Sequence, residues 1–95
     1  RTMVIGYLEL DLHFPHARSL KDKRKELNGL KDRIRRKHNV ALAELDFQDV
    51  WQRTKIGVVT LNSHQTIVEQ VLSRIRTDVF ENVNGELLGS RIEYY

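Results

Sequence analysis

The chain has 95 residues, of which 40% are hydrophobic and 31% charged, and these values are typical of one small globular domain. It has no cysteine, which excludes disulfides and thiolate chemistry and favours a cytoplasmic location. We recognise no signal peptide and no apolar run of the ~20 residues that span a bilayer, so we expect no membrane partner. We expect one domain over residues 3–95, with Arg1 and Thr2 added ahead of a native start at Met3.

The first predicted element is a half-buried strand that follows Met3 and reaches Phe14. Apolar and polar residues alternate along it with a period of two, as expected for a strand with one buried face. The polar positions, which would face away from the core, are Tyr7, Glu9, Asp11 and His13. Pro15 ends the strand, because proline cannot donate to a strand ladder.

The next predicted element is a helix from about Ser19 to Lys37. Ser19 is a suitable N-cap, and Asp22 lies three residues further on, as in a capping box. One apolar stripe indicates the buried face; it contains Leu20, Leu27, Leu30 and Ile34. Gly29 lies inside this helix, where glycine is unfavourable, and it suggests a close packing contact.

Two strands are predicted next, over Val40 to Phe47 and Lys55 to Leu61. The short connection between them contains Trp51, the only tryptophan in the chain. A lone tryptophan in a connection more often plugs the edge of a small core than binds a ligand, so we favour a plug over base stacking.

A second helix, capped by Asn62 or Ser63, and a final strand from Leu87 to Tyr95 complete the predicted elements. The apolar stripe of this helix contains Val68, Val71, Leu72, Ile75 and Val79. The resulting order is β-α-β-β-α-β. It favours an α+β, ferredoxin-like sandwich, with a four-stranded antiparallel sheet and both helices on one face.

Positive charge is concentrated in the first helix. Residues 18–37 contain ten basic and three acidic residues, a net charge of +7, whereas the rest of the chain has six basic and ten acidic residues, a net charge of −4. Several basic residues lie at the start of the helix, where the macrodipole favours acids, and such broken local rules often mark functional sites. A solvated helix face is the alternative interpretation.

We therefore predict a phosphate-binding or nucleic-acid-binding surface on this helix, with a partner such as structured RNA or the ribosome. Free amides of the Pro15–Ser19 loop and the first turn would share an anion with it. The predicted contact residues are Arg18, Lys21, Lys23, Arg24, Lys25, Lys31, Arg35 and Arg36.

Two further hypotheses stay open from the residues alone. The uncovered sheet face, with one aromatic and two carboxylates on its first strand, is a poor RNA platform but could pair with a second copy of the chain. The start of the first helix could instead bind a small anionic ligand. We predict no enzymatic activity, no cofactor and no metal site, because His13 and His16 lack further ligands and no catalytic motif is recognisable.

A resemblance to a known family adds to this interpretation. The segment Ser19-Leu20-Lys21-Asp22-Lys23-Arg24 resembles the S-L-K-x-K-R signature of the YlxP-like family, also called domain of unknown function 503. Further matching pieces are Met3-Val4-Ile5-Gly6, Pro15 ahead of Ala17-Arg18, Asn39-Val40, Ala43-Glu44 and Trp51-Gln52. His16 departs from the small residue, often glycine, that the family has there. The resemblance implies a ferredoxin-like fold. It also implies a connection to the ribosome or RNA, because family members are often encoded near translation-initiation and ribosome-maturation factors.

Overall fold

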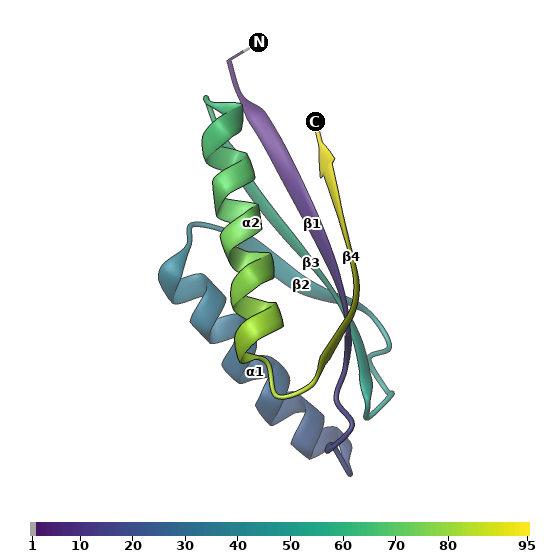
Figure 1. The fold of residues 1–95 in the computed structure, drawn as a ribbon. Coiled ribbons are helices and arrows are strands. Elements are labelled where there is room, and N and C mark those ends of the chain that lie inside the picture. The colour runs from purple at the N-terminus through teal and green to yellow at the C-terminus, as the bar shows by residue number, and fades with distance from the viewer. Residues whose placement is uncertain (1) are drawn as a thin grey trace.

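The computed structural model describes residues 2–95; Arg1, one of the two residues predicted to be additions, lies outside this range. Six elements follow the predicted β-α-β-β-α-β order (Figure 1): β1 Val4–His13, α1 Leu20–Lys37, β2 Ala41–Asp46, β3 Arg53–Asn62, α2 Gln65–Asn82 and β4 Glu86–Tyr94. The four strands form one sheet in the order β2-β3-β1-β4, with antiparallel neighbours throughout. The ferredoxin-like α+β fold is confirmed.

The period-two pattern of β1 decides which side of the sheet is buried. Leu8, Leu10 and Leu12 are fully buried, whereas Tyr7 and the polar residues that alternate with them are half-buried on the other face. In the register with β3, Leu8 lies opposite Val58 and Leu10 opposite Ile56. Both partners are also fully buried, so the two central strands present one continuous apolar face.

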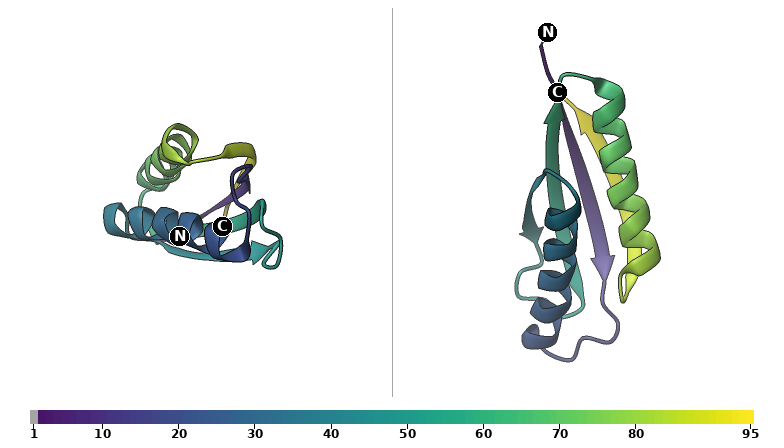
Figure 2. Two further views of the ribbon diagram at one scale, coloured as in Figure 1. Left: turned by 90° about the horizontal axis from the view of Figure 1, so that it is seen from below. Right: turned by 90° about the vertical axis from the view of Figure 1, so that its left-hand side faces the viewer.

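Both helices lie on this face of the sheet and leave the other face open (Figure 2). Their buried apolar residues complete the core cluster: Leu27, Leu30 and Ile34 from α1, and Val68, Leu72, Ile75 and Val79 from α2. Each set repeats at three- and four-residue spacing, which places its members on one side of a helix.

The ends of the helices differ in detail from the predictions. Ser19 is the N-cap of α1, and its hydroxyl accepts from the amide of Asp22 at 3.0 Å, as predicted. The N-cap of α2 is His64 rather than Asn62 or Ser63. Asn62 still contributes, because its side-chain oxygen accepts from the His64 amide at 3.0 Å. This Asx-type turn moves the helix start two residues along the chain.

Gly29 does not mark a packing contact, and that prediction is wrong. A Cβ built on Gly29 meets no atom within 4 Å, because the residue lies on the exposed side of α1. We therefore expect Gly29→Ala to raise the free energy of unfolding by about 0.5–1 kcal/mol, since alanine loses less backbone entropy in a helix. Urea denaturation would measure this change. A loss of stability would contradict the conclusion that a side chain at position 29 has open space around it.

Candidate nucleic-acid interface

Seven of the eight predicted contact residues lie along the accessible part of α1 and the residues just before it. Six are exposed and Lys31 is half-buried. We call this set the basic surface: Arg18, Lys21, Arg24, Lys25, Lys31, Arg35 and Arg36. At 1.5 Å per residue, the helical part of the surface from Lys21 to Arg36 extends over about 23 Å. The exposed acids of the same segment are Asp22 and Asp32, so the basic surface is strongly positive.

Lys23 is not part of this surface, and its prediction as a phosphate contact is wrong. Only 1% of the residue is exposed. Its Nζ lies 2.9 Å from the Glu44 carboxylate and donates to the carbonyl oxygens of Phe47 and Gln48. The Glu44 carboxylate also accepts from the hydroxyl of Thr54 at 2.5 Å. This cluster joins α1 to β2, β3 and the connection between them, and it has no access to an external phosphate.

The two remaining basic residues of α1, Arg33 and Lys37, form ion pairs with a carboxylate of α2. Arg33 Nε lies 3.2 Å from the Asp78 carboxylate of α2, and Lys37 Nζ lies 4.0 Å from the other oxygen of the same group. By contrast, no side chain of the basic surface forms an ion pair within residues 2–95. The structure therefore separates two kinds of cation in this segment: those paired with carboxylates of other elements, and those that form no ion pair within residues 2–95.

Three of the backbone amides near the helix start already have partners within the protein. The amide of Ala17 donates to the Phe14 carbonyl at 3.1 Å, and that of Arg18 donates to the Asp22 carboxylate at 3.0 Å. The amide of Asp22 is taken by Ser19. The Asp22 carboxylate also supplies the negative charge that a helix N-terminus favours. These three amides are therefore not available to an anion, whereas the phosphate site predicted at the Pro15–Ser19 loop and the first turn of α1 stays a prediction.

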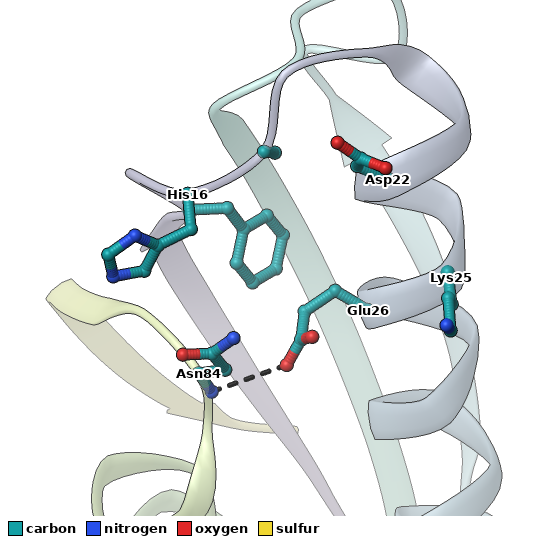
Figure 3. Close-up of a pocket in the computed structure, with 7 residues that line it drawn as sticks. His16, Asp22, Lys25, Glu26 and Asn84 are labelled. Carbon is teal, nitrogen blue, oxygen red and sulfur yellow. Dashed lines mark hydrogen bonds between the residues drawn. The ribbon is translucent and has the colours of Figure 1, made fainter.

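A cavity of about 240 Å³ lies between the start of α1 and the α2–β4 connection (Figure 3). The Glu26 side chain points across it and accepts from the Asn84 amide at 3.3 Å. Asp22 and Lys25 also line it. Two carboxylates against one lysine make this cavity unsuited to a phosphate.

The open face of the sheet carries a network of ion pairs near its middle. Arg91 lies 3.0 Å and Lys55 3.7 Å from the Glu9 carboxylate, while Arg53 lies 2.8 Å from Asp11. Hydrogen bonds from Tyr7 and then Arg91 hold the pKa of Glu9 below its usual range. These cations already have carboxylate partners. That the face is a poor RNA platform stays a prediction.

The Tyr7 hydroxyl, which donates to Glu9 at 2.7 Å, gives this network a pH dependence. Burial and the hydrogen bond to Glu9 raise the pKa of Tyr7 from 10.0 to about 12. The stabilisation is present below about pH 10 and is lost as the pH rises towards 12, because the unfolded chain releases the proton first. We expect the stability difference between the wild type and Tyr7→Phe to shrink over this interval in alkaline denaturation. Exposed Tyr94→Phe is the control. A stability difference between the wild type and Tyr7→Phe that stays constant over this pH interval would contradict the raised pKa of Tyr7.

Trp51 does not plug the core, so the favoured interpretation of this residue is wrong. The residue is 51% exposed and lies in the connection between β2 and β3. Its side chain borders a cavity of about 340 Å³ together with residues 15–18.

Sequence reasoning also missed Phe47, which adopts a φ of 65° and places its ring under the Arg53 guanidinium, 4.6 Å from the ring centroid.

Residues 2–95 contain neither a cluster of metal ligands nor a membrane-spanning helix. No three histidine, aspartate or glutamate side chains come together as a potential metal site. His13, one of the two histidines considered as ligands, instead lies 3.4 Å from Glu86 of β4. Neither helix combines the length and hydropathy of a membrane-spanning segment.

The sequence of this chain matches a known protein family. The family model described as "Protein of unknown function (DUF503)" matches residues 5–92. The "Uncharacterized protein YlxP" of Bacillus subtilis strain 168 is 36% identical over 72 residues, which cover 76% of this chain and 78% of that protein.

Solved structures show the same fold at low sequence identity. The de novo designed protein Foldit4 is 12% identical with a TM-score of 0.57, and the match covers 98% of this chain and 96% of the design. A structural-genomics protein, YJCS, is 13% identical with a TM-score of 0.53 over 94% of this chain and 96% of its own. At these identities the likeness concerns the fold alone.

Proposed function

We propose that this chain, which belongs to the DUF503 family of proteins of unknown function, is a non-enzymatic RNA-binding factor that docks on structured RNA, such as that of the ribosome, through its basic surface. One observation carries the proposal. Seven basic side chains extend along α1 without an ion pair in residues 2–95, although the other three basic residues of the segment are paired with carboxylates.

The placement of these charges supports a partner more than it supports stability. Lys21 lies in the first turn of α1, where a cation is disfavoured by a few tenths of a kcal/mol, and Arg24 and Lys25 add further positive charge in the second turn. A solvated face that served only solubility would have no need for this arrangement. A polyanion would relieve the repulsion between neighbouring cations and release the counterions condensed on its backbone.

The shape of the surface favours a duplex or folded RNA over a small anion. The cations are spread over about 23 Å of helix, whereas one small ligand would need them to converge. The cavity beside Lys25 contains two carboxylates. Binding should therefore follow the phosphate backbone, with little dependence on base sequence and a strong dependence on salt.

A charge-reversal experiment tests the proposal. Lys21→Glu/Arg24→Glu should weaken binding to a labelled RNA hairpin at low salt by at least about tenfold, because each lost phosphate contact removes part of the electrostatic free energy. The matched control is Arg74→Glu/Arg76→Glu, which makes the same change in net charge at exposed arginines of α2. Equal losses in both variants would indicate nonspecific charge attraction, and unchanged affinity in the first would refute the proposal.

The open sheet face supports a second candidate function, self-association. Beyond the ion pairs its surface is apolar, and Leu61 and Tyr95 are 63% and 54% exposed. The residues of the ion-pair network balance in charge, because three acids face three bases: Glu9, Asp11 and Glu93 against Arg53, Lys55 and Arg91. A second copy would therefore meet no net repulsion there, unlike at the basic surface.

Light scattering tests this candidate directly. We expect the mass of a dimer at high protein concentration and that of a monomer for Leu61→Asp, which places an unpaired charge in the interface. Since Leu61 is exposed, the variant should keep its fold. A wild type that stays monomeric at every concentration would remove the homodimer.

A further inference from the structure

We propose that Trp51 and the Pro15–Arg18 loop form a stacking site for one unpaired nucleobase of the bound RNA, an inference that rests on the proposed RNA-binding function. The site is the cavity of about 340 Å³ between the β2–β3 connection and the residues before α1. This volume falls within the range of roughly 300–1,000 Å³ that small-molecule sites occupy. Its lining residues are Pro15, His16, Ala17, Arg18, Trp51 and Gln52.

The connection that carries Trp51 is fixed to the rest of the protein, so the half-exposed indole is not on a loose loop. Gln52 Nε2 donates to the carbonyls of Pro15 at 3.2 Å and Ala17 at 3.1 Å. The Gln52 carbonyl accepts from the Phe14 amide at 2.8 Å. From the other side, the buried Lys23 donates to two carbonyls of the same connection. The chain on both sides of Trp51 is therefore held before any ligand arrives, which lowers the entropic cost of binding.

The chemistry of the walls fits a nucleotide. An exposed indole offers a flat surface on which any base can stack, and this contact is tolerant of sequence. Arg18 lies at the same cavity and is the first cation of the basic surface. A base on Trp51 would therefore place its own phosphate beside Arg18 while the neighbouring backbone continues along α1. A paired base cannot reach such a site, so the RNA must present a bulged or looped nucleotide.

Trp51 is the only tryptophan, so its fluorescence reports this site alone. We would compare an RNA hairpin that has a single-nucleotide bulge with the same hairpin fully paired, and with a third in which the bulged nucleotide is abasic. Anisotropy of a labelled end would measure binding independently of the tryptophan. We expect the bulged RNA to bind about 5- to 150-fold more tightly than the other two and to quench Trp51.

Variants separate this site from the basic surface. Trp51→Ala should remove the preference for the bulge and keep the salt-dependent binding of the paired hairpin, while Trp51→Phe should retain part of the preference. A preference that persists in Trp51→Ala, or fluorescence unchanged when anisotropy shows binding, would overturn the stacking site alone. If anisotropy shows no binding of any RNA, the proposed function fails, and the stacking site fails with it.

Discussion

Replacing Lys23 with alanine is expected to lower the free energy of unfolding by about 3–5 kcal/mol. The substitution leaves the Glu44 carboxylate, of which the side chain is only 16% exposed, without its cation. It also leaves the Phe47 carbonyl without the lysine donor and opens a cavity where the lysine stem was packed. Chemical denaturation would measure the loss. Exposed Lys25→Ala, on the same helix, is the control and should change stability by no more than about 0.5 kcal/mol.

A double-mutant cycle would show whether the loss comes from the unpaired charge. Glu44→Gln alone leaves the ammonium of Lys23 buried and should also be strongly destabilising. Lys23→Met/Glu44→Gln removes both charges and should recover most of the stability, because a buried ion pair contributes little beyond an apolar pair of similar size. Additive losses would contradict a direct coupling between the two residues.

Replacing Gly6 with alanine is expected to cost about 1–3 kcal/mol by overpacking the contact between β1 and α2. A Cβ at Gly6 would clash with a Val68 methyl carbon and would lie 2.8 Å from a Leu72 methyl carbon. Val68 cannot easily turn away, because a β-branched side chain in a helix has one strongly preferred rotamer. Thermal or urea denaturation of Gly6→Ala would measure the effect.

Two further variants test the steric explanation of the Gly6 effect. Gly89→Ala changes another strand glycine, but a Cβ there meets nothing within 4 Å, so it should be nearly neutral or stabilising. Gly6→Ala/Val68→Ala removes the clashing methyl group and should be less destabilised than the sum of its single variants. A Gly6→Ala protein as stable as the wild type would show that α2 can shift away from the sheet.

Most of the fold could be predicted from local patterns. The alternation in β1, the stripes of the two helices and the cap at Ser19 each depend on residues close together in the sequence. The start of α2 was harder to predict, because Asn62 closes a turn ahead of the helix instead of capping it. Phe47 was not predictable, because a non-glycine residue at a φ of 65° is held there by tertiary contacts.

The site could be predicted only in part, because sequence shows charge but not partners. In the sequence Lys23 resembles the other cations of the helix, because its partner Glu44 lies 21 positions away and only the fold brings the two together. A signal was nevertheless present. Lys23 continues the helical stripe of Leu27, Leu30 and Ile34, and Glu44 points to the helix side of β2 like Leu42. The exposure of Trp51 depends on how its connection folds against the Pro15–Arg18 loop, which no local pattern shows.

The salt dependence of binding to a structured RNA tests the central claim most directly. If the basic surface follows the phosphate backbone, log affinity should fall with log salt with a slope of about −4 to −6, since each phosphate contact on a duplex contributes roughly −0.9 and seven cations set the limit. Arg24→Ala should make the slope less steep by about one, and Arg76→Ala on α2 should leave it unchanged. No binding at low salt, or a slope near zero, would contradict an RNA-binding function for α1.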